Sequence, residues 1–230
     1  MAQTILITGA NRGIGLELAR QAAARGDRVV ATARRPGAAG ALSALASGSA
    51  EVEVHGLDVT RPEELEGIAA AVRRPVDLVI CNAGQYLARG GIEDPDYSAE
   101  AWERTLMTNV AGVFFTVRAF LPALEAAEAG KVAVISSIMG SGARAPGMSY
   151  IYRASKAAAT NLALNLAAEL GQRGIAVGAY HPGWVRTDMG GEGADISPEE
   201  SAAGLLARFD ALSLETTGCF EDHAGEPIPL

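Results

Sequence analysis

The chain has 230 residues, of which 49% are hydrophobic and 20% are charged, and its formal net charge at pH 7 is −8. This balance is typical of a folded globular protein and excludes a disordered chain. The acidic charge argues against a nucleic-acid partner and against binding to an anionic membrane surface, because both need a basic face.

Three further features of the composition narrow the class of protein. Apolar stretches are interrupted before they reach ~18 residues, which predicts no transmembrane helix. The first residues lack a basic segment ahead of an apolar run, so we expect a cytoplasmic protein. The 2 cysteines and 3 histidines share no ligand spacing, which predicts neither a disulfide framework nor a metal site.

The chain opens with a predicted strand–turn–helix–strand unit. Residues 4–7 and 28–32 are short apolar runs typical of buried strands, and residues 14–25 have the apolar spacing of a helix. The turn between them places Gly9, Gly13 and Gly15 in the spacing Gly-x-x-x-Gly-x-Gly. Glycines in such a turn allow a tight bend, let the backbone approach a pyrophosphate and let helix and strand pack closely. With the free N–H groups of the helix N-terminus, they predict a dinucleotide-binding site.

The residues after the second strand indicate which dinucleotide is bound. A fold of this type that prefers NAD usually places an acid there to hold the ribose 2′-hydroxyl. This chain has Arg34 and Arg35 instead, and Arg12 lies in the neighbouring glycine turn. Guanidinium groups suit a 2′-phosphate because they form forked, charge-assisted hydrogen bonds. We therefore expect NADP(H) rather than NAD(H); the plainer interpretation is a solvated basic turn.

The middle of the chain continues the alternation of strands and helices. We expect a helix around Leu42 and Leu45, a strand at 51–54, a helix from an N-cap at Thr60 to about residue 73, and a strand at 76–80. Asn82 follows that last strand, at the edge where open α/β sheets bind ligands. Its amide also suits a purely structural role in the turn.

Two long helices are predicted next, at residues 99–126 with a bend near Asn109 and at residues 152–170. A strand at 131–136 and a Gly/Ser/Pro-rich loop at 138–150 separate them. The second helix has no charged residue between Lys156 and Glu169, which is typical of a helix buried on most faces. We therefore expect these two helices to form the interface of a homodimer or homotetramer.

The last part of the chain adds a strand at 175–180, a helix at 198–212 that a capping box opens at Ser197, and a short strand at 217–220. Neither an internal repeat nor a linker is present. The alternation predicts an α/β fold: a Rossmann-type, doubly wound parallel β-sheet with helices on both faces, forming a single domain over residues 1–230.

Tyr152 and Lys156 are the candidate acid/base pair. They are four residues apart, so they lie one turn apart on the same face of a helix. A neighbouring ammonium favours the phenolate and lowers the pKa of a tyrosine. By itself this spacing is weak, because a half-buried tyrosine beside a solvated lysine is common.

Taken together, these motifs resemble the short-chain dehydrogenase/reductase family over essentially the whole chain. The turn at residues 8–15 is similar to its cofactor turn, and Cys81-Asn82-Ala83-Gly84 is similar to its Asn-Asn-Ala-Gly, with Cys in the first place. Pro182-Gly183-Trp184-Val185 resembles its nicotinamide segment, and Asn109, Ser137, Tyr152 and Lys156 match its catalytic tetrad. Residues 135–141, 152–156 and 184–191 are similar to the C-factor and sniffer-like carbonyl reductase branch.

The resemblance implies NADPH-dependent reduction of an aldehyde or ketone to an alcohol. Ser137 and Tyr152 would bind the carbonyl oxygen, and Tyr152 would donate the proton. Lys156 would lower the tyrosine pKa and contact the nicotinamide ribose, and Asn109 would hold a water that links Lys156 to solvent. The cofactor-binding residues that it implies are Gly9, Asn11, Arg12, Gly13, Ile14, Gly15, Arg34, Asp58, Val59, Asn82, Ala83, Gly84, Tyr152, Lys156, Pro182, Gly183, Val185 and Thr187.

Some alternatives stay open at this point. The loop from Ser137 to Tyr152 is a couple of residues longer than in most of the family, so Ser136 or Ser141 could replace Ser137; Tyr150 is excluded as the acid because no lysine follows it by four residues. A nucleotide-binding sensor or signalling protein with little turnover is an alternative function. A sugar-nucleotide epimerase is disfavoured because only about 40 residues follow Thr187. The same shortness predicts an open site with broad carbonyl acceptance.

Overall fold

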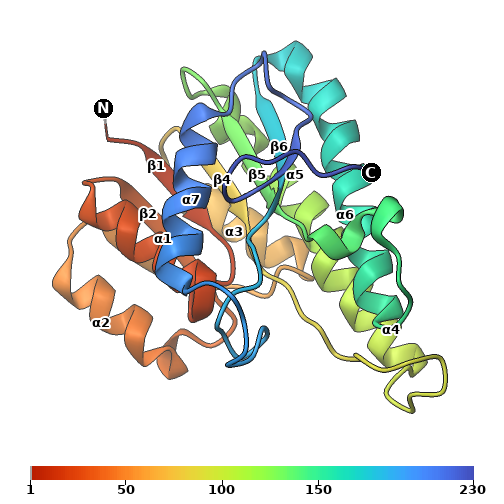
Figure 1. Cartoon of the computed structure of the whole chain (residues 1–230). Coiled ribbons are helices and arrows are strands. Elements are labelled where there is room, and N and C mark those ends of the chain that lie inside the picture. Colours follow the sequence, from red (N-terminus) through yellow and green to blue (C-terminus); the bar gives the residue numbers. More distant parts are fainter. Residues whose placement is uncertain (1) are drawn as a thin grey trace.

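The computed structural model describes residues 2–230, and a single seven-stranded sheet runs through its centre (Figure 1). Every neighbouring pair is parallel, and the strand order is β3-β2-β1-β4-β5-β6-β7. The strands are β1 Thr4–Ile7, β2 Arg28–Ala33, β3 Val52–Gly56, β4 Leu78–Cys81, β5 Lys131–Ile135, β6 Ala176–His181 and β7 Phe220–Asp222. The order reverses between β1 and β4, which leaves a crevice at their carboxyl ends.

Helices cover both faces of the sheet. The α-helices are α1 Gly13–Ala24, α2 Gly40–Gly48, α3 Pro62–Ala71, α4 Ala99–Leu106, α5 Gly112–Glu125, α6 Tyr150–Leu170 and α7 Pro198–Ala211. Side chains of α1, α2 and α7 pack into one hydrophobic core, and side chains of α3, α5 and α6 pack into the other. Figure 1 shows α1 and α7 in contact on the near face of the sheet.

The strands have apolar residues on both faces because both faces are covered. In β1, Ile5 and Ile7 belong to one core and Leu6 belongs to the other. A parallel sheet buried on both sides requires this nearly continuous apolar run. The predicted α/β class with a doubly wound parallel sheet is thereby confirmed.

The helical run Ala99–Glu125 has the predicted bend. A π-helical turn, η2 (Met107–Ala111), separates α4 from α5 and contains Asn109. By length and composition this run could also cross a membrane, since a window of it has a mean hydropathy of 1.4. Core helices of folded proteins meet the same criterion, so the prediction of no transmembrane helix stays a prediction. Within the fold, the run packs against α3, β4 and α6.

Three local predictions differ from the structure. Thr60 is not an N-cap: its backbone N–H and hydroxyl both donate to Asp58, and α3 begins after Arg61 with no side-chain cap. The last strand lies at Phe220–Asp222 rather than 217–220, because residues 214–218 form turns. The loop at 138–150 contains two short 3₁₀ helices, η3 (Ile138–Gly140) and η4 (Gly142–Arg144), and α6 already begins at Tyr150.

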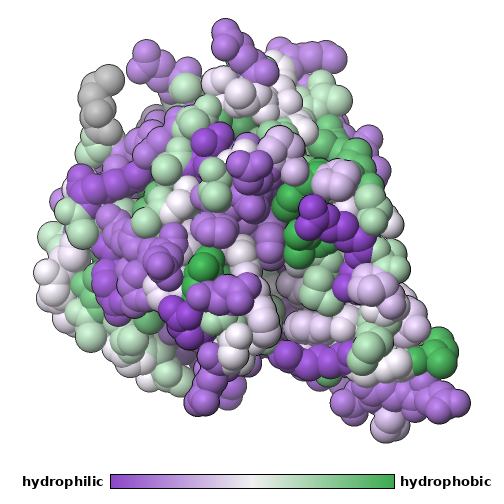
Figure 2. Space-filling view, in the orientation of Figure 1, coloured by the Kyte–Doolittle hydropathy of each residue, from purple (hydrophilic) through white to green (hydrophobic). Residues whose placement is uncertain are grey.

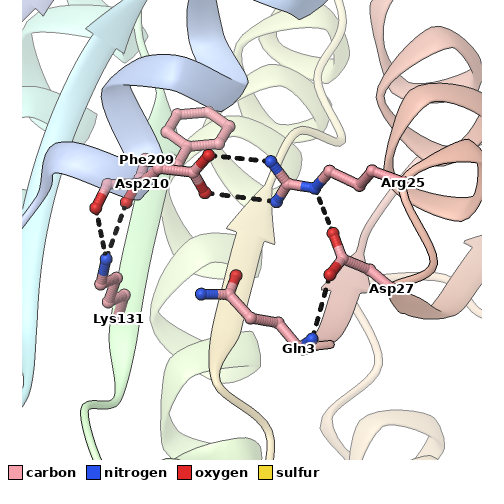
Figure 3. A network of polar contacts seen from close by, with 6 residues as sticks. All are labelled: Gln3, Arg25, Asp27, Lys131, Phe209 and Asp210. Atoms are coloured by element: carbon pink, nitrogen blue, oxygen red, sulfur yellow. Dashed lines mark hydrogen bonds and ion pairs between the residues drawn. The ribbon is translucent and has the colours of Figure 1, made fainter. Parts of the chain in front are cut away.

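A polar network closes the amino-terminal edge of the sheet, opposite the crevice (Figure 3). Arg25, after α1, pairs with Asp27 and with Asp210. Asp27 also accepts a hydrogen bond from the backbone of Gln3 over 3.0 Å. Lys131 donates to the carbonyl oxygens of Phe209 and Asp210 over 3.1 and 2.8 Å, which satisfies the free carbonyls at the end of α7. The network holds this edge together and leaves the other edge free to form the site.

Candidate active site

A cleft of about 560 Å³ lies at the carboxyl ends of the strands. Figure 2 shows the surface indented at the lower edge of the molecule, below the sheet as Figure 1 orients it. Most of the predicted site residues line this cleft: Gly9, Asn11, Arg12, Gly13, Ile14, Gly15, Arg34, Asp58, Val59, Asn82, Ala83, Gly84, Tyr152, Lys156, Pro182 and Thr187. Residues scattered over the whole sequence therefore meet in one depression.

The glycine turn forms one wall of the cleft. Gly9 and Gly13 have φ angles of 67° and 55°, which side chains of L-residues rarely allow. A Cβ atom on Gly15 would lie 2.5 Å from the carbonyl oxygen of Gly9 and 2.4 Å from the side-chain nitrogen of Asn82. α1 begins at Gly13 with no side-chain cap and no acidic residue in its first turn. Its free N–H groups and partial positive charge suit a phosphate.

Asn82 ties the glycine turn to the end of β4. Its side-chain nitrogen donates to the carbonyl oxygens of Thr8 and Gly9 over 2.9 and 3.0 Å. The hydroxyl oxygen of Thr8 in turn accepts from the backbone N–H groups of Asn82 and Ala83 over 3.0 and 3.1 Å. The structural role that the sequence suggested for Asn82 is therefore present, and it shapes the cleft wall.

A basic corner lies where β2 and β3 end. Arg34 and Arg35 line the cleft beside Asp58. Partial burial opposes ionisation of Asp58, yet the hydrogen bonds from Thr60 and the charges of Arg34 and Arg61 prevail and lower its pKa. Arg12 reaches across the cleft mouth and pairs with Asp188, and both side chains are exposed.

Tyr152 and Lys156 lie at the other end of the cleft, on α6. Both are buried, and the side-chain nitrogen of Lys156 lies 5.6 Å from the centre of the Tyr152 ring. Burial lowers the pKa of Lys156 to about 8. Burial raises the pKa of Tyr152 to about 12, and a hydrogen bond with Ser137 opposes that rise. The sequence suggested that Lys156 would lower the tyrosine pKa; in this structure burial has the larger effect and the pKa is raised.

The three candidate serines lie in different surroundings. Ser136 lines the cleft, but its hydroxyl already bonds to the carbonyl oxygen of Lys156 over 3.1 Å and to Thr160 over 2.6 Å. The buried hydroxyl of Ser141 has no hydrogen-bond partner among the described residues. Ser137 accepts from the backbone of Met139 over 3.1 Å, and its hydroxyl opposes the rise in the pKa of Tyr152. Of the three, Ser137 is the one that meets the tyrosine.

Asn109 is buried in the π-helical turn η2. Its side-chain nitrogen donates to the carbonyl oxygen of Gln85 over 3.0 Å and to Ser155 over 2.9 Å, and its oxygen accepts from the backbone of Gln85 over 2.9 Å. A Cβ atom on Gly84 would lie 3.5 Å from that oxygen and 3.7 Å from the side-chain nitrogen of Lys156. Gly84 thus keeps the space between Asn109 and Lys156 open.

The segment after β6 is only partly in the cleft. Pro182 and Thr187 line it, whereas Gly183 and Val185 do not. Gly183 packs towards Ile196, which a Cβ atom on it would meet at 2.5 Å, and Val185 is a buried bridge partner of Ile196. Their predicted contact with a nicotinamide is not evident in the cleft lining.

Two residues at the Tyr152 end were not predicted. The ring of Tyr86 stacks on that of Tyr152, with centroids 4.2 Å apart and planes at 19°. The guanidinium carbon of Arg89 lies 4.4 Å from the Tyr86 ring centre. Both stand on the irregular loop at residues 85–97, where hydrophobic periodicity gives no information about which side chains face the site. The sequence signal that could have indicated them is an aromatic residue and an arginine soon after Asn82.

Comparison with known proteins identifies the class. Residues 3–195 match the family model of the short chain dehydrogenases, so the chain belongs to that family. It is 36% identical to 1-hydroxy-2-glutathionyl-2-methyl-3-butene dehydrogenase of Rhodococcus sp. (strain AD45), over 96% of this chain and 97% of that one. It is 37% identical to C-signal of Myxococcus xanthus, over 67% of this chain and 93% of that one.

Two solved structures are similar over their full length. Carbonyl reductase Sniffer of D. melanogaster has a TM-score of 0.93 at 26% identity, covering 100% of both chains. The NADPH-bound carbonyl reductase from chicken fatty liver has a TM-score of 0.92 at 31% identity, covering 100% of this chain and 99% of that one. The resemblance to the C-factor and sniffer-like branch is thereby confirmed, and the chain is an oxidoreductase of this family.

Proposed function

We propose that this chain is an NADP(H)-dependent carbonyl reductase that converts an aldehyde or ketone to an alcohol. The observation that carries the proposal is the position of Tyr152 and Lys156, which line one end of a cleft whose other end is the glycine turn. Ser137 lies beside them and acts on the titration of the Tyr152 phenol. The carbonyl reductases among the similar structures, one of them NADPH-bound, support the same activity.

The cleft fits a dinucleotide phosphate. Side chains are missing where they would block the backbone, at Gly9 and Gly15, and the N-terminus of α1 offers unpaired N–H groups. Arg34 and Arg35 would hold the 2′-phosphate, with Arg12 available once its exposed pairing with Asp188 is exchanged. Asp58 and Val59 would lie beside the adenine. When bound, the cofactor supplies the hydride.

Tyr152 is the proton donor in this proposal. With its pKa raised to about 12, the phenol stays protonated at neutral pH and is ready to act as an acid. Ser137 would hold the substrate oxygen from the other side and stabilise the developing negative charge. The proton leaves the phenol oxygen for the alkoxide, so the charge of Lys156 is needed to stabilise the phenolate that remains.

Asn109 positions the groups around Lys156. Its side-chain amide is occupied by Gln85 and Ser155, so a water linking Lys156 to solvent would bind its backbone carbonyl, which the π-helical turn η2 displaces from regular helix geometry. Gly84 leaves the room for such a water. This makes Asn109 a positioning residue rather than a proton carrier.

We also propose that the chain is cytoplasmic and assembles as a homodimer or homotetramer through residues 99–126 and 152–170. Three large apolar side chains of this run are exposed, Trp102 and Leu106 on α4 at 37% each and Phe114 on α5 at 41%, and an interface would cover them. Sedimentation velocity at micromolar concentration tests the assembly; a monomer would contradict it.

A signalling or sensor protein with little turnover is the second candidate. The similarity to C-signal of Myxococcus xanthus favours it. The presence of all four residues Asn109, Ser137, Tyr152 and Lys156 favours catalysis instead, because a protein that only binds the nucleotide does not need them. Steady-state assays with aldehydes, ketones and quinones, each with NADPH and with NADH, distinguish the two. Turnover of no carbonyl compound alongside tight NADPH binding would favour the sensor.

A further inference from the structure

Arg89 and Tyr86 form a stack over the proposed proton donor. Tyr86 lies 4.2 Å from Tyr152 between ring centres, and the guanidinium carbon of Arg89 lies 4.4 Å from the ring centre of Tyr86. These separations bring the Arg89 charge to no more than about 9 Å from the Tyr152 ring, near enough to act on its titration. Burial raises the pKa of Tyr152, and the charge of Arg89 opposes that rise.

The base of this stack is anchored to the start of α6. The hydroxyls of Tyr86 and Ser149 are hydrogen-bonded over 2.5 Å, and the Ser149 hydroxyl also bonds to the carbonyl oxygen of Arg89 over 3.2 Å. The backbone N–H of Ser149 donates to the carbonyl oxygen of Gly90 over 3.1 Å. Ser149 directly precedes α6, so the backbone of Arg89 is tied to the helix that carries Tyr152.

The guanidinium of Arg89 has hydrogen-bond donors that remain unpaired within residues 2–230. One of its terminal nitrogens donates to the carbonyl oxygen of Met189 over 2.8 Å, and Met189 lines the same cleft as Tyr152. A guanidinium has five N–H groups, so most remain available. Within residues 2–230, no carboxylate lies within ion-pair distance of Arg89, although Arg12, Arg25 and Arg28 all have one. The side chain is exposed at the rim of the cleft.

We propose that Arg89 binds a carboxylate of the substrate, so that the carbonyl compounds this chain reduces carry an anionic group. The inference rests on the proposed function, because it assigns the substrate of that same site. A carboxylate fits the forked N–H groups of a guanidinium, and the ring of Tyr86 holds the guanidinium plane in place. The substrate must then span from Tyr152 to Arg89, about the length of one aromatic ring with a carbonyl and a carboxylate on opposite ends.

A matched pair of substrates tests this assignment. 4-Carboxybenzaldehyde and methyl 4-formylbenzoate have the same ring and the same aldehyde, and only the first is an anion. We expect wild-type kcat/KM with NADPH to be about tenfold or more higher for the acid, the range of a charge-assisted hydrogen bond at a partly exposed site. Arg89→Met should bring the ratio of kcat/KM for acid over ester close to one, and Arg89→Lys should keep part of it. The ratio is the readout because any effect of the lost charge on the titration of Tyr152 acts on both substrates alike. Arg73→Met, an exposed arginine at the opposite edge of the sheet, is the matched control and should change neither substrate.

A binding measurement separates this inference from the proposed function. Calorimetric titration with the alcohol product, 4-(hydroxymethyl)benzoate, and with its methyl ester needs no turnover. Tighter binding of the acid by wild type, lost in Arg89→Met, supports the carboxylate site even if neither aldehyde is reduced, and in that case only the proposed function fails. Equal binding of acid and ester by wild type, or an equal loss of both in Arg89→Met, would overturn the inference.

Discussion

The side-chain nitrogen of Lys156 donates a hydrogen bond to the backbone carbonyl oxygen of Ile135 over 2.7 Å. This contact fixes the lysine at the end of β5, inside the protein and beside the space that Gly84 keeps open. It is the one polar contact of this side chain among the described residues, and it does not offset the burial that lowers the lysine pKa to about 8. The fold thus fixes the position of the ammonium, and burying its charge lowers the free energy of unfolding.

The first prediction concerns this buried ammonium and pH. The folded-state pKa of Lys156 is about 8, below its ordinary 10.5. Between pH 8 and pH 10.5, Lys156 is therefore protonated in the unfolded chain and largely deprotonated in the folded chain. The contribution of Lys156 to the free energy of unfolding therefore rises as pH rises through that window, by roughly 1–3 kcal/mol. Denaturant unfolding of wild type and of Lys156→Met at pH 7.5 and pH 10 measures it. A difference between the two proteins that stays constant with pH would contradict the prediction.

The second prediction separates the three serines. Ser137→Ala should lower kcat about 10²-fold, because the hydroxyl that meets Tyr152 is lost. Ser136→Ala should instead lower the free energy of unfolding by about 1–3 kcal/mol, since it leaves Thr160 without its buried partner. Ser141→Ala, whose hydroxyl has no partner among residues 2–230, should do neither. Steady-state kinetics and urea unfolding of the three variants check the assignment, and a loss of kcat in Ser136→Ala alone would reverse it.

The third prediction concerns the glycine turn. Gly15→Ala should weaken NADPH binding more than tenfold, because the new Cβ atom would meet the carbonyl oxygen of Gly9 at 2.5 Å and displace the turn. Gly67→Ala in α3 is the control: nothing lies within 4 Å of its Cβ position, so it should raise the free energy of unfolding by about 0.5–1 kcal/mol. Fluorescence titration with NADPH tests both, and unchanged binding in Gly15→Ala would exclude this turn as the phosphate site.

The fourth prediction concerns cofactor choice. Arg34→Gln should raise the Kd for NADPH about tenfold or more and leave the Kd for NADH within about twofold, because only NADPH carries the 2′-phosphate. Arg73→Gln, at an exposed position on the opposite edge of the sheet, is a control of equal charge change, for which we expect no effect on either Kd. Wild-type turnover that is faster with NADH than with NADPH would contradict the role given to Arg34.

Much of the fold was predictable because the strands are continuous apolar runs and the helices have clear periodicity. The capping box at Ser197 was found from four residues alone. The assignment of Thr60 as a cap failed because α3 begins one residue later, after Arg61, and hydrogen bonds to Asp58 hold Thr60 in a turn before the helix. Which of two neighbouring polar residues precedes the helix depends on backbone geometry, which cannot be read from the sequence.

The sequence was sufficient to predict the site residues that lie on helices and strands, such as Tyr152 and Lys156 on α6. The choice between Ser136 and Ser137 was not, because it depends on which side of one strand end faces the phenol. Tyr86 and Arg89 were missed for a related reason. They stand on an irregular loop, which hydrogen bonds to Ser149 and from Arg89 to Met189 hold over Tyr152.

The most direct measurement of the central claim is single-turnover reduction of a carbonyl compound by Tyr152→Phe, with NADPH binding measured on the same preparation. Phenylalanine keeps the ring stacked on Tyr86 and removes the hydroxyl group that donates the proton in the proposed reaction. We expect the rate to fall at least about 10³-fold, with the Kd for NADPH within about threefold of wild type. A rate within tenfold of wild type would contradict the role of Tyr152 as the proton donor.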